Sequence, residues 1–385
     1  MYGIHPALPS YLAQQWCCEE PDDHPQQRSA AATALLDAYA ALGRWLLQQI
    51  ISGDAAFAFS VLDRQKRTLG NLLANALDTG QWNQAQAIAQ PLNEYWDTRG
   101  LYDEARGWVD RAHMALETTD GTPPLVDDPA RELWLYFAYS QANRQLTAHY
   151  LDDAERTYLD IRDMLQAHPE SPQQLLRLAD IYHQLGRVAE LRGRWEEAEE
   201  WYRQALTIKE EFGNRSGMAG SYHHLGIVAQ FRGRLEEAEE WYRQSLAIKE
   251  ELGDRPGMAG SYHQLGVIAQ RRARLEDAEQ WYRQALTINE ELGNRPVMAM
   301  SFVQLGLLAE TRGRPEEAME WMVRCVTLFD EFPRPMTERG PTQLARLTAE
   351  LGIDTLNESG IGVTDHPLPP EVQNFTAPGT GQDEK

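Results

Sequence analysis

The stretch that decides the fold is 221–260, which reads SYHHLGIVAQFRGRLEEAEEWYRQSLAIKEELGDRPGMAG. Residues 261–300 repeat it at 27 of 40 positions without a gap. Over about 181–331, three small or aromatic residue types recur every 40 residues: Trp201, Trp241, Trp281 and Trp321; Gly186, Gly226, Gly266 and Gly306; Ala198, Ala238, Ala278 and Ala318. A fixed period of this length indicates a protein built from stacked repeats.

Each repeat is predicted to form two helices. In the first, Tyr222, Leu225, Gly226 and Ala229 lie three and four residues apart and share one face. Gly233 interrupts the pattern, because glycine readily adopts the left-handed backbone that ends a helix. The second helix begins at about residue 235 and turns small and apolar residues inward: Ala238, Trp241, Tyr242, Ser245 and Leu246. No alternating β-branched runs indicate a sheet.

These residues resemble the tetratricopeptide repeat (TPR) pattern of aromatic, Leu, Gly, apolar, Ala, aromatic and Ala residues. The matching positions are Tyr222, Leu225, Gly226, Ala229, Ala238, Tyr242 and Ser245. The repeat has 40 residues rather than 34, as in kinesin light chains and many bacterial signalling proteins. We therefore predict an all-α, right-handed superhelical TPR solenoid of antiparallel helix pairs. Ala273 replaces the turn glycine in one repeat, and Met322 replaces the tyrosine in another.

The rest of the chain contains weaker copies of the same unit. Gly80–Ala85, Gly100–Ala105 and His149–Ala154 keep the spacing of Gly193–Ala198. The predicted organisation is a lead-in segment (1–27), irregular TPR-like hairpins (28–118), a loop (119–129), a degenerate repeat (130–170), four regular repeats (171–331), a capping helix (332–359) and a disordered tail (360–385).

A second resemblance lies in the lead-in segment. Tyr2–Leu12, YGIHPALPSYL, is similar to the segment that leaves the winged-helix region of signal-transduction ATPases of the STAND or NB-ARC class. In those proteins a helical array follows and senses the trigger. The resemblance implies that this chain is the sensor part of a larger protein or a stand-alone relative of one.

Charge and cysteine content narrow the class of protein. The chain has 58 acidic and 36 basic residues, a net charge of -22, which disfavours binding to nucleic acid or to an anionic membrane. It contains neither a signal-peptide pattern nor an apolar run of about 18 residues that could span a bilayer. Cys17, Cys18 and Cys325 have no C-x-x-C spacing, so neither a disulfide framework nor a zinc site is predicted. A cytoplasmic location is expected.

No sequence motif indicates catalysis. The phosphate-binding G-x-x-x-x-G-K-[ST], the metalloprotease H-E-x-x-H and the hydrolase G-x-S-x-G are all missing from the sequence. We predict no enzymatic activity, no cofactor and no metal site. The tryptophan series is interpreted as core, and the acidic stretch Glu236–Glu240 as a solvated outer face.

The candidate binding residues come from the first helix of each repeat, whose non-core positions line the concave groove in TPR proteins. Carried onto this chain, the set is His183, Arg187, Glu190, His223, Ile227, Gln230, Phe231, His263, Val267, Gln270, Arg271, Leu307 and Glu310. Some of these positions change character between repeats while the packing residues stay fixed, as expected of a scaffold that binds a protein or peptide. Neutral drift of exposed positions is the alternative explanation.

Two other functions remain open from the sequence: a regulatory subunit or domain of an enzyme, such as a STAND ATPase whose catalytic part lies outside this chain, and a purely structural spacer. The sequence makes no prediction about the oligomeric state.

His183, His223 and His263 recur every 40 residues, so stacking should align them along one wall of the groove. If their pKa values are near 6.5, ligand affinity should change between about pH 7.5 and 5.5. Alternatively, each histidine hydrogen-bonds the adjacent helix.

Overall fold

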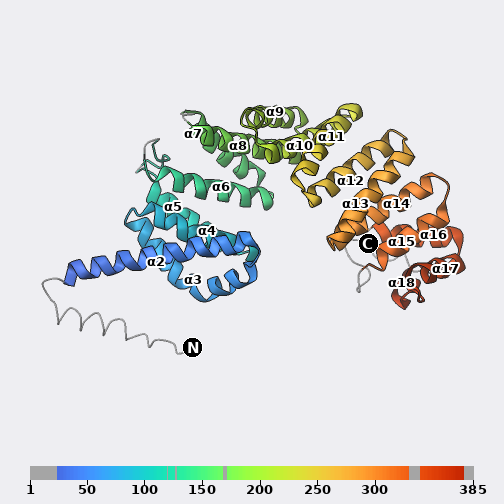
Figure 1. Ribbon diagram of the computed structural model, residues 1–385, viewed down its shortest axis with the longest axis horizontal. Coiled ribbons are helices and arrows are strands. Elements are labelled where there is room, and N and C mark those ends of the chain that lie inside the picture. The colour runs from blue at the N-terminus through green and yellow to red at the C-terminus, as the bar shows by residue number, and fades with distance from the viewer. Residues whose placement is uncertain (1–23, 119, 126–127, 168–170, 329–338, 377–385) are drawn as a thin grey trace. The chain divides into compact units, whose positions relative to one another are not determined.

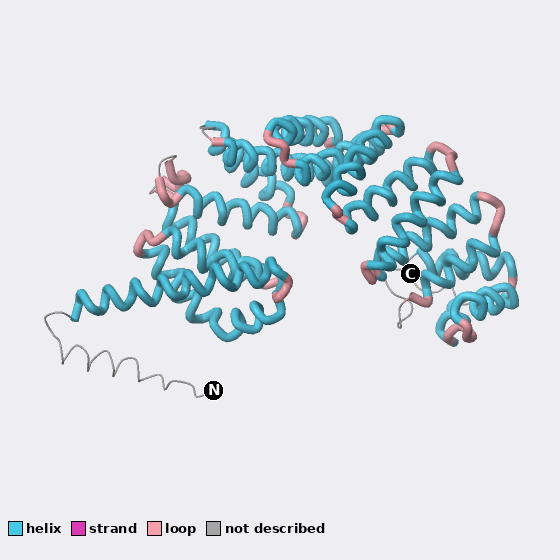
Figure 2. The backbone as a smooth tube through the Cα atoms, viewed as in Figure 1, coloured by secondary structure: helices cyan, strands magenta, loops and turns pink. Residues whose placement is uncertain are grey.

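The structure is a computed structural model that describes residues 24–118, 120–125, 128–167, 171–328 and 339–376. In these ranges every regular element is a helix and there is no strand (Figure 2). The chain divides into two compact units, Met1–His168 and Pro169–Lys385. The all-α solenoid of antiparallel helix pairs is confirmed. The resemblance at Tyr2–Leu12 lies outside the described residues, as do Cys17 and Cys18.

The N-terminal unit contains six described helices (Figure 1). These are α2 (His24–Ser52), α3 (Ala55–Asp78), α4 (Trp82–Arg99), α5 (Tyr102–Leu116), α6 (Arg131–Thr147) and α7 (Leu151–Ala167). Helix α2 packs against both α3 and α4, and α6 packs against α7 and α5. Each hairpin buries its small alanines, such as Ala85, Ala105 and Ala154, so that the paired helices approach closely.

The C-terminal unit begins with four helix pairs, one for each regular repeat. The first helices are α8 (Pro172–Leu191), α10 (Arg215–Phe231), α12 (Arg255–Arg271) and α14 (Arg295–Thr311). The second helices are α9 (Trp195–Glu211), α11 (Leu235–Leu252), α13 (Leu275–Glu291) and α15 (Pro315–Val326). Each helix packs against its neighbours in chain order (Figure 1). Pro315 begins its helix, where its missing N–H is tolerated.

A glycine on the first helix and a ring on the second set the spacing within each pair. A Cβ atom added at Gly226 would lie 2.6 Å from the ring of Tyr242. The same distance separates Gly186 from Tyr202 and Gly266 from Tyr282. These tyrosines are completely buried. In the fourth repeat Met322 replaces the tyrosine, and its flexible side chain fills the space beside Gly306.

Three described turns adopt the left-handed backbone without glycine, at His149, Ala273 and Asp365. Ala273 has a φ of 57°, whereas the corresponding Gly233 has a φ of 76°. His149, between α6 and α7, has a φ of 61°. Because this conformation is unfavourable for residues with a Cβ atom, packing of the flanking helices must hold these turns in place.

An arginine–glutamate ladder connects successive repeats. Glu239 on α11 is 11% exposed and accepts hydrogen bonds from Arg243 on its own helix and from Arg272 and Arg274 in the next repeat. Glu199 makes the corresponding contacts with Arg203, Arg232 and Arg234. Burial raises the pKa of Glu239, but the hydrogen bonds from Arg243 and Arg274 outweigh it and leave the pKa lowered.

The interpretation of Glu236–Glu240 as a solvated face is therefore wrong for Glu239. The i,i+4 pair of Glu239 with Arg243 forms as expected, with a nitrogen–oxygen distance of 2.9 Å, but Glu239 lies between repeats rather than in solvent. The reason is the basic turn, whose arginines reach back to the preceding second helix. Glu240 is exposed.

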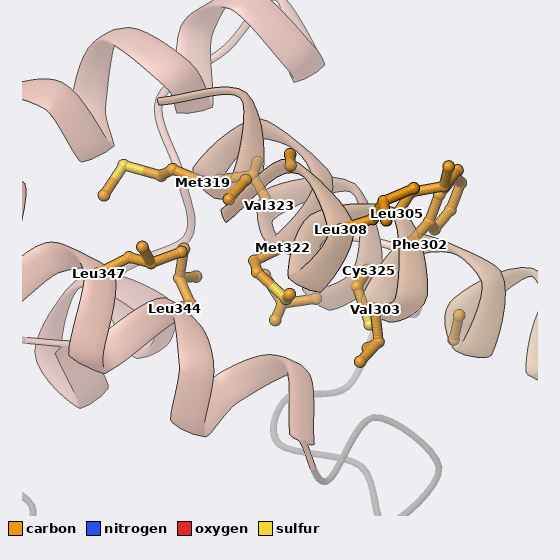
Figure 3. Close-up of a cluster of buried hydrophobic side chains, with 14 of the residues drawn as sticks. Phe302, Val303, Leu305, Leu308, Met319, Met322, Val323, Cys325, Leu344 and Leu347 are labelled. Carbon is orange, nitrogen blue, oxygen red and sulfur yellow. The ribbon is translucent and has the colours of Figure 1, made fainter. Parts of the chain in front are cut away.

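The C-terminal end of the solenoid is covered by three further helices, α16 (Arg339–Leu351), α17 (Ile353–Thr364) and α18 (Pro370–Thr376). Leu344 and Leu347 of α16 lie toward Met319 and Met322 of α15 (Figure 3) and are completely buried. Helix α16 lies within 332–359, the range predicted for a capping helix.

The predicted disordered tail from residue 360 is wrong over its described part. Helix α17 continues to Thr364, and α18 follows after a short connection. Leu368 and Val372 are buried against this cap, and a Cβ atom on Gly360 would lie 2.6 Å from Leu368. Leu368 lies in the connection before α18 and Val372 lies in α18, so the burial of both side chains holds this helix against the cap although prolines surround them. Residues 377–385 lie outside the described ranges.

The glycine–tyrosine contact predicts the effect of a single methyl group. Gly226→Ala should lower the free energy of unfolding by about 1–3 kcal/mol, because the added Cβ overlaps the buried Tyr242 ring. The matched control is Gly260→Ala in α12, where nothing lies within 4 Å of the added atom. That variant should gain up to about 1 kcal/mol from helix propensity. Urea unfolding followed by circular dichroism measures both, and equal effects would contradict the assigned packing.

Candidate binding surface

The predicted site residues lie on the four first helices of the C-terminal unit. We call this surface the first-helix face and define it by the residues of α8, α10, α12 and α14 named as candidates: His183, Arg187, Glu190, His223, Ile227, Gln230, Phe231, His263, Val267, Gln270, Arg271, Leu307 and Glu310. Their spacing of three and four residues puts them on one side of each helix.

One row of this face is held in position by the core. The tyrosine hydroxyl of the second helix donates a hydrogen bond to the row residue of its own repeat. The oxygen–oxygen distances are 2.8 Å from Tyr202 to Glu190, 3.1 Å from Tyr242 to Gln230 and 2.9 Å from Tyr282 to Gln270. The fourth repeat has no such hydroxyl, and Glu310 pairs with Arg346 of α16 instead.

A second row changes from charged to apolar along the solenoid. Arg187 on α8 donates a hydrogen bond to Gln184 over 3.0 Å. Ile227, Val267 and Leu307 occupy the corresponding positions and are half-buried against the underlying hydrophobic clusters. The first repeat therefore presents a cation where the others present an apolar stripe.

The most exposed part of the face lies at the C-terminal ends of the first helices. Phe231 is 58% exposed, and its ring stacks on Trp195 with a centroid separation of 4.4 Å. Arg271 is exposed at the corresponding position of the next repeat. Exposed aromatic and arginine side chains are both enriched in protein interfaces.

The histidine row behaves differently from the expected pH-sensitive wall. The rings of His183, His223 and His263 pack 5.3–5.5 Å from the buried tyrosine rings of their repeats. Burial lowers the pKa of His183 to about 2 and of His223 to about 3, and it also lowers the pKa of His263. Lys209, Arg187 and His224 lower the pKa of His183 further.

His183 and His223 therefore stay neutral between pH 7.5 and 5.5, contrary to the expectation that they titrate in this range, and burial shifts the pKa of His263 in the same direction. The alternative was that each ring hydrogen-bonds the adjacent helix. No such bond forms through Nδ1, because the Nδ1 atoms of all three histidines are buried without a partner among the described residues. The row ends at Val303, which belongs to the buried core.

Sequence reasoning missed a row of buried polar residues on the second helices. Lys209 is paired with Asp180, with a nitrogen–oxygen distance of 3.4 Å. Lys249, only 9% exposed, donates a hydrogen bond to Ser261 over 3.0 Å, and burial lowers its pKa. Asn289 takes the same place in the third repeat. The signal was a polar residue recurring every 40 residues next to apolar inner positions.

A small polar cluster on the first repeat was also missed. The Nδ1 atom of His224 lies 2.9 Å from a carboxylate oxygen of Glu190, which also accepts the hydroxyl of Tyr202. His224 and Glu190 are 34 residues apart, so the cluster joins α8 to α10. Among the residues that the structure describes, no group of three or more histidine, cysteine or acidic side chains is placed to hold a metal ion. Nor is any described helix both long and apolar enough to cross a membrane.

These features define an α-solenoid built from repeated helix pairs. Residues 177–251 and 257–331 match the tetratricopeptide repeat family, and this part of the chain consists of tetratricopeptide repeats. A search among curated proteins found no match.

Solved structures share the fold. A STAND protein with a tetratricopeptide repeat sensor from Pyrococcus horikoshii aligns with a TM-score of 0.58 at 14% identity, covering 84% of this chain and 47% of that chain. A Rap protein aligns with a TM-score of 0.52 at 13% identity, covering 89% of this chain and 88% of that chain. BtubC from P. vanneervenii has a TM-score of 0.47 at 19% identity, covering 63% of this chain and 94% of that chain.

The buried histidines predict an acid-sensitive fold. The unfolded chain binds protons at these rings near pH 6.5, whereas the folded chain does so at lower pH. Stability is therefore fully present above pH 6.5 and falls as the pH decreases, by up to about 1.4 kcal/mol per pH unit for each histidine. Replacing His183, His223 and His263 by glutamine should flatten this dependence between about pH 6.5 and 5.

The measurement is urea unfolding at several pH values, with exposed His366→Gln as the control variant. An acid dependence that the triple variant shares with the unmodified protein would show that these rings are not buried in the neutral form.

Proposed function

We propose that the first-helix face of the C-terminal unit binds a peptide segment of a partner protein, and that the chain is a non-catalytic sensor or adaptor module of a bacterial-type signalling system in the cytoplasm. The observation that carries the proposal is a contrast within one chain. The glycine–tyrosine contacts and the ladder are repeated almost unchanged, whereas neighbouring positions of the face differ from repeat to repeat.

The chemistry of the face suits an extended peptide. Ile227, Val267 and Leu307 provide a half-buried apolar stripe for side chains. Gln230 and Gln270 accept a hydrogen bond from a tyrosine, so their amide groups are already oriented. A preformed surface avoids much of the entropy lost when a flexible site becomes ordered on binding.

The solved neighbours agree with this proposal at the level of the fold. The Rap protein is complexed with Competence and Sporulation Factor, and the Pyrococcus protein carries a tetratricopeptide repeat sensor. A sensor role is the inference we draw for this chain.

A second candidate function is a regulatory domain of a STAND ATPase. It is favoured by the alignment of 84% of this chain with less than half of the Pyrococcus protein. This candidate requires the same face to bind a trigger, and differs in the output, which would be ATP hydrolysis by another part of the protein. The remaining alternative is a structural spacer that binds no peptide.

Selection of peptides from a random displayed library tests the proposal. Phe231→Ala combined with Arg271→Ala should weaken the selected peptide at least about tenfold, which corresponds to about 1.4 kcal/mol. Isothermal titration calorimetry measures the affinity. Both side chains are exposed, so helical content should not change.

The matched control is Glu240→Ala, an exposed substitution on the second helix of the same repeat, which should leave the affinity within about twofold. The opposite ranking would place the site on the second helices. Failure to select any peptide would favour the spacer.

A further inference from the structure

A pocket in the N-terminal unit has features that the peptide-binding proposal does not use. It has a volume of about 680 Å³ and lies between the end of α5, the loop before α6, the start of α6, and α7. Its apolar wall includes Pro123, Pro124, Leu125 and Met164. Pockets of this volume are of the size that binds small organic ligands.

The pocket is lined by a buried cation without a counter-ion. Arg131 is the first residue of α6 and is only 3% exposed. Its Nη2 atom donates a hydrogen bond to the carbonyl of Met164 over 2.9 Å, whereas Nε has no partner. No described carboxylate forms an ion pair with it. The positive end of the α6 dipole adds to this charge.

A buried charge without a counter-ion is unfavourable, so an anion bound beside the guanidinium would complete the site. Three of the acidic residues near it are already engaged. Glu117 accepts hydrogen bonds from Trp134 Nε1 over 3.0 Å and from His113 Nδ1 over 2.7 Å. Asp163 is paired with Arg162, and Asp128 accepts from the backbone of Ala130.

The same pocket also presents hydrogen-bond acceptors. In the tautomer whose Nδ1–H donates to the Glu117 carboxylate, the Nε2 atom of His113 carries the lone pair. That atom is buried without a partner. Asp160 lines the pocket without an ion pair to a described cation. The site therefore combines a donor for a carboxylate with acceptors for an N–H group.

The geometry points to a binding site for a free amino acid with an apolar side chain. Arg131 and the start of α6 bind the carboxylate, His113 and Asp160 accept from the ammonium group, and the proline-rich wall contacts the side chain. Asp160 and Asp163 disfavour multiply charged anions such as phosphate. This site is separate from the first-helix face and does not depend on the function proposed for it.

Three probes that share a phenyl group separate the contribution of the carboxylate from that of the ammonium group. Isothermal titration calorimetry on the full chain should rank phenylalanine above 3-phenylpropionate, and 3-phenylpropionate above phenethylamine. We expect phenylalanine to bind with a dissociation constant of about 1 mM or tighter. Inorganic phosphate should bind more weakly than 3-phenylpropionate.

Two variants test the named residues. Arg131→Met should abolish binding without lowering the melting temperature of the ligand-free protein, because it removes an unpaired buried charge. Asp160→Asn, an exposed substitution at the rim, should reduce the preference for phenylalanine over 3-phenylpropionate at least about threefold. Arg111→Gln is the control, since Arg111 pairs with Asp78 outside the pocket.

Binding that survives in Arg131→Met, or no binding of phenylalanine to the unmodified protein, would overturn the assignment. If Arg131→Met fails to fold, the assignment is tested by the ranking of the probes and by the effect of Asp160→Asn. A ranking with phenethylamine first would also contradict it.

Discussion

In three of the four regular repeats, a glycine on the first helix lies against the ring of a buried tyrosine on the second, leaving no room for a methyl group between them. The rest of the repeat depends on this contact. It brings the helices close enough for the tyrosine ring to pack against a histidine ring. The tyrosine hydroxyl then reaches the first-helix face and orients Glu190, Gln230 or Gln270. Close packing inside each pair thus determines the side-chain geometry outside it.

A different set of contacts joins one repeat to the next. The ladder of Glu199, Glu239 and Glu279 connects each second helix to the basic turn that follows. Arg203, Arg243 and Arg283 lie over the tryptophan of the next repeat, at 5.2–5.6 Å from the ring. Because none of these contacts uses the side chain of a candidate residue, the face can vary without loss of the stacking on which a repeat protein depends.

Much of this fold could be predicted from the sequence because the repeat is a periodic signal. The helix pairs, the Gly226 contact and the turn at Ala273 all follow from one 40-residue pattern. The burial of His183, His223 and His263 could not be predicted. Periodicity shows which face of a helix a residue lies on, but not how much of its side chain a neighbouring helix covers. The inter-repeat role of Glu239 depends on arginines 33 and 35 residues away. Helix α18 was missed because the prolines around Leu368 and Val372 indicated a disordered segment.

The central claim is that recognition uses the first helices while the second helices hold the solenoid together. The most direct test is photo-crosslinking of a library-selected peptide that carries a photoreactive side chain, followed by mass spectrometry of the adducts. Adducts within 215–231 and 255–271, the α10 and α12 segments, are the predicted result. Adducts confined to α11 and α13, at 235–252 and 275–291, would contradict the account.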